Sequence, residues 1–151
     1  MRYFALIIST VVVCLIHPSV YAGEPNAAYM LDMAEKLNGH RRTLVEMRKG
    51  VPSDDWFNVL ELMSNALKST DDAYALAILL YLRSNMVDKS DWAVVNVVLK
   101  HEKTSFEATC RTNIERINVQ IGSARSPGVV SEGEHLRDDL VAVCDRVKSM
   151  K

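Results

Sequence analysis

Two cysteines constrain the fold of this chain more than any other feature. Each belongs to a series of apolar residues at helical spacing. The two series are Phe106, Cys110, Ile114, Ile117 and Ile121, and Leu136, Leu140, Cys144 and Val147. Between them, residues 123–130 contain Pro127-Gly128, a pair typical of turns. The pattern therefore predicts a C-terminal antiparallel helical hairpin, with one cysteine on each of the two facing apolar stripes.

The two cysteines also lie at matching distances from the predicted turn. Cys110 precedes Ser123 by 13 residues and Cys144 follows Ser131 by 13 residues, which is about 20 Å along each helix. We therefore expect a Cys110–Cys144 disulfide. It would close a loop of 34 residues and stabilise the fold by about 3–4 kcal/mol in the chain-entropy model. The alternative is a pair of buried free thiols that pack as small apolar side chains.

Residues 1–22 are typical of a cleaved signal peptide. Arg2 precedes an apolar run over residues 3–16, Pro18 follows it, and Val20 and Ala22 occupy the positions that a signal peptidase recognises. A membrane anchor would need about 20 apolar residues. We expect cleavage after Ala22 and export to a periplasmic or extracellular space, where paired cysteines oxidise. The alternative of a lipid-modified Cys14 is disfavoured by the bulky valines before it.

Residues 23–151 predict a single all-α domain of five to six helices. Helix-start residues precede apolar periodic segments near Asn26, Ser53, Ser69, Ser90, Thr104 and Ser131. Residues 26–50 fit one kinked helix or two short ones, and residues 90–122 also fit one helix or two. The second helix has a periodic apolar set that predicts its inner face: Trp56, Leu60, Met63 and Leu67. Residues 73–82 are nearly all apolar, which predicts a central, buried helix.

Charge and motifs give no support for catalysis, cofactor binding or nucleic-acid binding. The chain has 18 basic and 19 acidic side chains. Removal of the predicted signal peptide would remove Arg2 and leave 17 basic and 19 acidic side chains, a net charge of −2. Nucleic acids and anionic membranes favour a basic face instead. Neither the histidine spacing nor the cysteine count fits a metal site. Adjacent acids stand at 54–55, 71–72 and 138–139, and the first two pairs fit helix starts, where the dipole favours negative charge.

The leading functional hypothesis is a small exported protein, without catalysis of its own, that binds another protein. The narrower hypothesis is an inhibitor or immunity-type protein that occludes a secreted or delivered enzyme or toxin. Candidate partner-binding residues are Arg41 and Arg42, which form a basic patch, Val51 and Pro52 in a predicted loop, and the aromatic Phe57. One alternative is a self-associating assembly module of the cell envelope, for example a homodimer. A second alternative is an enzyme with dispersed carboxylates.

Overall fold

The computed structural model describes residues 25–85 and 89–150 and is all-helical over those ranges, as predicted. Its elements are α2 (Pro25–Met47), the short 3-10 helix η2 (Ser53–Asp55), α3 (Trp56–Asn85), α4 (Lys89–Ser123) and α5 (Pro127–Ser149). The predicted signal peptide, residues 1–22, lies outside the described residues.

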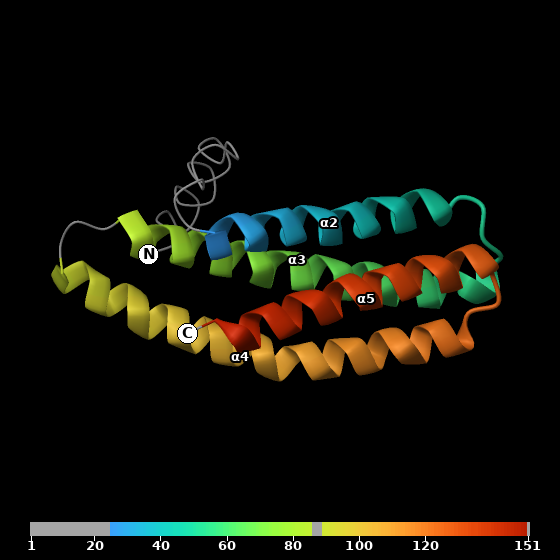
Figure 1. The fold of residues 1–151 in the computed structure, drawn as a ribbon. Coiled ribbons are helices and arrows are strands. Elements are labelled where there is room, and N and C mark those ends of the chain that lie inside the picture. Colours follow the sequence, from blue (N-terminus) through green and yellow to red (C-terminus); the bar gives the residue numbers. More distant parts are fainter. Residues whose placement is uncertain (1–24, 86–88, 151) are drawn as a thin grey trace, which may run out of the picture.

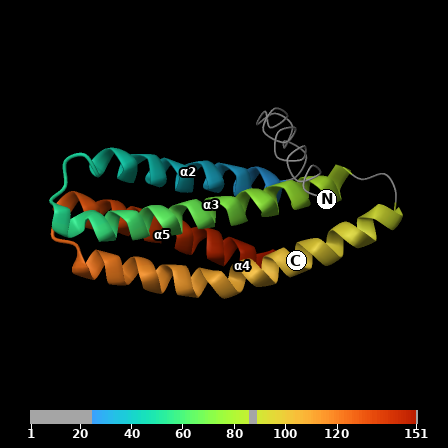
Figure 2. The ribbon, with the colours of Figure 1, turned by 180° about the vertical axis from the view of Figure 1, so that it is seen from behind.

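The four long helices form an up-and-down bundle (Figure 1). Each helix runs antiparallel to the one before it, and α2 packs against both α3 and α5. Seen from behind, the same order holds, with α3 and α4 extending beyond α2 and α5 at one end (Figure 2). The opposite end carries the α2–α3 connection and the α4–α5 connection side by side. Two connections far apart in sequence therefore share one end of the bundle.

The helices are fewer and longer than the predicted five to six. The predicted starts at Ser69 and Thr104 both lie inside continuous helices, α3 and α4. Thr70 Oγ1 donates to the Ala66 carbonyl at 2.8 Å, and Thr104 Oγ1 donates to the Lys100 carbonyl at 2.9 Å. These hydroxyls bond back to the preceding turn, as Ser and Thr side chains do within helices. Both hydroxyls therefore find their hydrogen-bond acceptors within a continuous helix and do not cap a new one.

The start of α5 also differs from the prediction. The helix begins at Pro127, a residue well suited to a first helical turn, so Ser131 lies inside the helix and does not cap its start. The connection from α4 shrinks to residues 124–126. Cys144 consequently lies 17 residues from the start of its helix, whereas Cys110 lies 13 residues from the end of α4. The extra four residues, about 6 Å, are absorbed because α5 begins beyond the end of α4 (Figure 1).

The predicted disulfide is present. Cys110 of α4 and Cys144 of α5 are bonded with their Cα atoms 6.0 Å apart, and both are buried. The disulfide lies at the edge of one continuous apolar core, to which all four long helices contribute. The large side chains that are fully buried in this core include Met30, Leu37, Leu44, Leu62, Leu76, Ile117, Leu136 and Leu140.

The interface between α3 and α4 includes a polar seam of four side chains, Asn58, Ser69, Asn113 and Ser123. Asn113 Nδ2 donates to Ser69 Oγ at 3.3 Å, and Ser123 Oγ donates to Asn58 Oδ1 at 2.8 Å. Asn113 is buried, and its Oδ1 has no hydrogen-bond partner among the described residues. An unpaired buried acceptor costs about 1–3 kcal/mol, so the seam contributes little net stability.

The predicted inner face of the second helix is wrong. Trp56, Leu60 and Leu67 are 45%, 46% and 48% exposed, while Val59 and Leu62 are fully buried. Two apolar series recur at helical spacing on α3, one that contains Trp56 and one that contains Val59 and Leu62. The series with the smaller side chains, Val59 and Leu62, packs inward. Residues 73–82 are likewise not buried all round. Ala73, Leu76, Ala77 and Leu80 face the core, whereas Tyr74, Ile78, Tyr81 and Leu82 are half-buried or exposed.

Candidate functional site

The two connections at the shared end of the bundle, residues 48–55 and 124–126, form a surface that we call the loop end. Its central contact is made by Asp55, which is 1% exposed. Asp55 Oδ1 accepts the backbone N–H of Arg125 at 2.9 Å, and Oδ2 accepts that of Ser126 at 2.6 Å. Asn58 Nδ2 donates to Oδ1 at 3.3 Å. One carboxylate therefore joins two connections that are 70 residues apart in sequence.

The same contacts determine the acidity of this carboxyl group. The backbone N–H of Arg125 has the largest effect and lowers the pKa of Asp55 to about 2, with smaller lowering by Ser126 and Asn58, although burial opposes the shift. Hydrogen bonds to the charged form favour ionisation. Asp54 adds an ion pair with Arg125 at 3.0 Å, but both side chains are exposed and such pairs contribute little. The loop end is thus held mainly by the buried carboxylate.

Three of the candidate partner-binding residues lie at or beside this clamped surface. Phe57, in the first turn of α3, is 66% exposed, and Pro52 is also exposed. Val51 is half-buried, and its carbonyl accepts Trp56 Nε1–H at 3.3 Å. The Arg48 guanidinium lies 5.6 Å from the centre of the Trp56 ring, within range of a cation–π interaction. The structure thus presents aromatic and apolar side chains next to a fixed loop.

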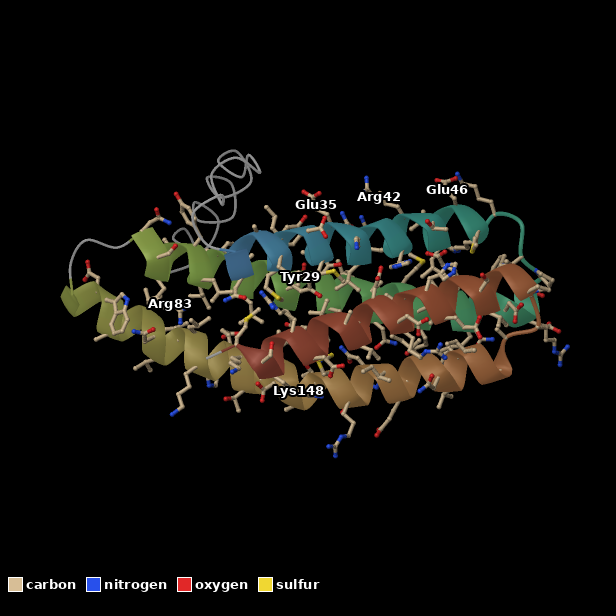
Figure 3. All side chains as sticks on the ribbon, in the orientation of Figure 1. Tyr29, Glu35, Arg42, Glu46, Arg83 and Lys148 are labelled. Atoms are coloured by element: carbon tan, nitrogen blue, oxygen red, sulfur yellow. A yellow bond between two sulfur atoms is a disulfide. The ribbon has the colours of Figure 1, made fainter. Side chains whose placement is uncertain are left out.

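Arg41 and Arg42 do not belong to the loop end, because they lie on α2 more than one turn before its last residue. Arg41 Nε donates to Asn38 Oδ1 at 2.9 Å. Arg42 is exposed and points away from the bundle, as does Glu35 (Figure 3). Both act on Tyr74 of α3: burial chiefly raises the pKa of Tyr74, Glu35 raises it further and Arg42 lowers it. Arg42 therefore lies close enough to α3 to act on Tyr74.

A second polar cluster, which the sequence did not predict, lies at the contact of α2 with α5. His40 Nδ1 lies 2.7 Å from Glu132 Oε1, and His40 Nε2 lies 3.0 Å from Asp139 Oδ2. Glu132 and His40 are only 12% and 14% exposed. Each ring nitrogen of His40 thus contacts one carboxylate of α5, so the arrangement joins α2 to α5 through one histidine. Glu132 and Asp139 are one heptad apart on α5, but nothing in the sequence pairs them with His40 rather than another histidine.

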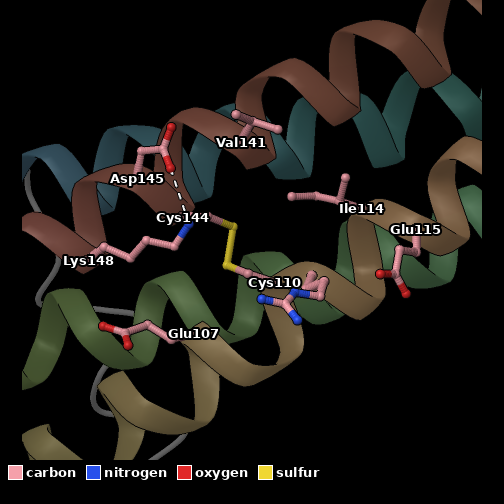
Figure 4. Close-up of a pocket in the computed structure, with 9 residues that line it drawn as sticks. Glu107, Cys110, Ile114, Glu115, Val141, Cys144, Asp145 and Lys148 are labelled. Carbon is pink, nitrogen blue, oxygen red and sulfur yellow. Dashed lines mark hydrogen bonds and ion pairs between the residues drawn. A yellow bond between two sulfur atoms is a disulfide. The ribbon is translucent and has the colours of Figure 1, made fainter.

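The disulfide forms part of the floor of a groove of about 440 Å³ between α4 and α5 (Figure 4). Ile114 and Val141 complete its apolar floor, and its charged lining consists of Glu107, Arg111, Glu115, Asp145 and Lys148. Asp145 and Lys148 pair with each other at 3.3 Å. The lining contains neither a histidine nor a hydroxyl nucleophile.

Within residues 25–85 and 89–150, no group of three His, Cys, Asp or Glu side chains could hold a metal ion. None of the described helices combines the length and the apolar character that a membrane span requires. Comparisons of the chain with protein-family models, with curated proteins and with solved structures found no match.

Proposed function

We propose that this protein is an exported, non-catalytic binding protein, and that its loop end docks on a partner protein. The observation that carries the proposal is the exposed group of Trp56, Phe57 and Leu60 beside a loop that Asp55 clamps. Exposed aromatic residues are enriched in the energetic centres of protein interfaces. A surface that is fixed before binding loses less conformational entropy when the complex forms.

The finer architecture supports the same role. We infer that α4 and α5 act as one antiparallel hairpin, stapled by Cys110–Cys144, that presents the turn at residues 124–126 to Asp55. The disulfide is compatible with an oxidising compartment outside the cytosol. It would also limit the separation of α4 from α5 and so keep the loop end in one shape. No cofactor is part of the proposal.

The partner that we favour is an enzyme or toxin whose cleft the loop end occludes. The end of a helical bundle is convex, and Pro52 and Phe57 are exposed at or beside this end, so a concave site would cover both. Arg48, which stacks on Trp56, would then face the rim of that cleft. Arg42 lies farther along α2 and would assist through long-range attraction to an acidic rim, which affects the association rate more than affinity.

The test compares two variants of the protein in capture and rebinding experiments. Phe57→Glu alters a side chain that is 66% exposed, and the control Val94→Glu alters one that is 64% exposed on α4, away from the loop end. A partner recovered from native extract is purified and its dissociation constant measured with each variant. We expect Phe57→Glu to weaken binding by about 30-fold, the effect of a hot-spot residue worth about 2 kcal/mol, and Val94→Glu to leave it unchanged.

The outcomes separate the hypotheses. A partner that is active alone and inactive in the complex supports the inhibitor hypothesis. Equal binding by wild type and Phe57→Glu, with both variants folded, would place the interface elsewhere. If the purified protein itself turned over a substrate, the non-catalytic proposal would be wrong.

A further inference from the structure

One flank of α3 carries a row of apolar side chains that we call the α3 stripe. Its members are Trp56, Leu60, Met63, Leu67, Tyr74, Ile78 and Tyr81. All are exposed or half-buried, and Met63, Tyr74 and Tyr81 also pack against the core. The stripe extends over about 37 Å of helix. Apart from a step of seven residues between Leu67 and Tyr74, its spacings of three and four residues are those of a helix–helix packing seam. The stripe thus has the form of a contact surface for another helix that lies along α3.

The spacing of the apolar residues in the stripe is almost the same when it is counted from either end. Counted from its middle, between residues 68 and 69, Trp56 mirrors Tyr81 and Met63 mirrors Tyr74, while Leu60 and Ile78 match to within one residue. In a two-fold contact each surface meets an identical copy of itself. Two α3 helices packed antiparallel would therefore bring these three apolar pairs level to within about 1.5 Å, with Leu67 next to the two-fold axis. A partner of unrelated sequence would not require this symmetry.

Charges on α2 match a second copy in the antiparallel orientation. Glu35 and Arg42 are exposed on α2 (Figure 3), and both act electrostatically on Tyr74, a member of the stripe. Glu35 lies in the N-terminal half of α2 and Arg42 in the C-terminal half. An antiparallel copy brings the acidic half of one α2 against the basic half of the other. Gly39 lies between them, and a Cβ atom added there would meet nothing within 4 Å, which leaves space for a close approach.

From these observations we infer that this protein forms a two-fold homodimer in which the α3 stripes of two copies pack antiparallel. The inference does not depend on the proposed partner at the loop end. Trp56 and Leu60 belong to both surfaces, whereas Phe57 and Leu67 each belong to only one. A dimer built in this way displays two loop ends, one at each end of the assembly, because the two copies run in opposite directions.

The first test is the molecular mass in solution over a dilution series, measured by sedimentation equilibrium on protein expressed from the full sequence with its disulfide intact. We expect a reversible dimer. Leu67→Glu places a charge near the axis in both copies and should weaken dimerisation at least about 100-fold. Val119→Glu is the matched control, because Val119 is 64% exposed on α4 and outside the stripe, and it should leave the dimer intact.

The second test fixes the orientation with cysteine variants. In the antiparallel dimer Met63 of one copy lies level with Tyr74 of the other, whereas two copies of Met63 are about 17 Å apart along the axis. A disulfide needs Cα atoms within about 7 Å. A mixture of Met63→Cys and Tyr74→Cys chains should therefore form a covalent dimer on oxidation, and Met63→Cys alone should not.

Several results would overturn the inference. These are a wild-type monomer at every concentration, a dimer that Leu67→Glu leaves unchanged, and a cross-link between two copies of Met63→Cys. Loss of the dimer in Val97→Glu, at the far end of α4, would also overturn it by assigning the interface to that end of the bundle. Phe57→Glu should keep the dimer and Leu67→Glu should keep partner capture, so the failure of either proposal is distinguishable from failure of the other.

Discussion

Replacing Gly133 by alanine tests how closely α5 packs against its neighbours. Gly133 is buried, and a Cβ atom added there would lie 2.8 Å from Ile121 Cγ1 and 3.5 Å from Leu62 Cδ1. Cγ1 of isoleucine is attached directly to the branched Cβ atom. It can move away only by rotation about a stiff torsion or by a shift of the backbone. We expect overpacking of this kind to cost about 1–3 kcal/mol.

The matched control is Gly122→Ala on α4. A Cβ atom at Gly122 meets nothing within 4 Å, and none of the described glycines has a positive φ. Alanine is favoured over glycine inside a helix by up to about 1 kcal/mol, so Gly122→Ala should raise the free energy of unfolding. Gly133→Ala gains the same propensity and loses it to the contact with Ile121. We expect the two variants to differ by about 1–3 kcal/mol, or about 4 °C in Tm per kcal/mol.

Urea unfolding followed by far-UV circular dichroism measures the difference, provided that both variants keep the m-value of the wild type. A further variant isolates the cause. Ile121→Ala removes Cγ1, so Gly133→Ala should no longer be destabilising relative to Gly122→Ala in that background. If Gly133→Ala stabilised the protein as much as Gly122→Ala, the close packing of α5 against Ile121 would be refuted.

Two further predictions concern the polar contacts. Folding lowers the pKa of Asp55 from its ordinary value of 3.8 to about 2. Its carboxylate therefore stabilises the fold above about pH 4, and this contribution is lost as the pH falls toward about 2. The difference in Tm between wild type and Asp55→Asn should shrink over that interval, and a difference that stays constant with pH would contradict the assignment. His40→Ala leaves two carboxylates without their common hydrogen-bond partner and should cost about 1–3 kcal/mol in urea unfolding. The exposed His135→Ala should change stability by less than about 0.5 kcal/mol, and equal effects of the two substitutions would show that the His40 cluster contributes nothing.

The sequence was sufficient to predict the all-α class and the disulfide, because both depend on patterns within single helices. Cys110 and Cys144 each lie on an apolar stripe, and this holds even though α5 starts at Pro127, four residues before the predicted cap. The number of helices was not predictable in the same way. Thr70 and Thr104 are good cap residues in isolation, but each can also bond to the carbonyl four residues earlier. The packing of the surrounding helix decides between the two.

The prediction of which face of α3 packs inward was wrong for a related reason. Two apolar series share the same period, and local spacing cannot distinguish the one that packs inward from the one that faces outward. The series with Trp56 has the larger side chains and was assigned to the core. In the bundle, α2 and α4 approach the side that carries Val59 and Ala66. Smaller side chains there allow the neighbouring helices to come closer.

The polar contacts of the site were out of reach of sequence reasoning. The sequence indicates only that Asp55 stands at a predicted helix start, where acidic side chains are favoured. Its carboxylate accepts hydrogen bonds from backbone groups 70 and 71 residues away. His40 contacts acids 92 and 99 residues away. Contacts of this range depend on the registration of whole helices, which no local motif encodes.

The polar seam between α3 and α4 bears on how that registration is chosen. Apolar side chains pack acceptably in more than one alignment, since a helix shifted by one turn, about 5.4 Å, still presents an apolar stripe. The seam does not tolerate such a shift, because Asn113 would leave Ser69 and Ser123 would leave Asn58. Every slipped alignment would then contain additional buried polar groups without partners. The seam adds little to the depth of the native energy minimum, but it raises the competing minima and so makes a single alignment of the two longest helices the favoured one.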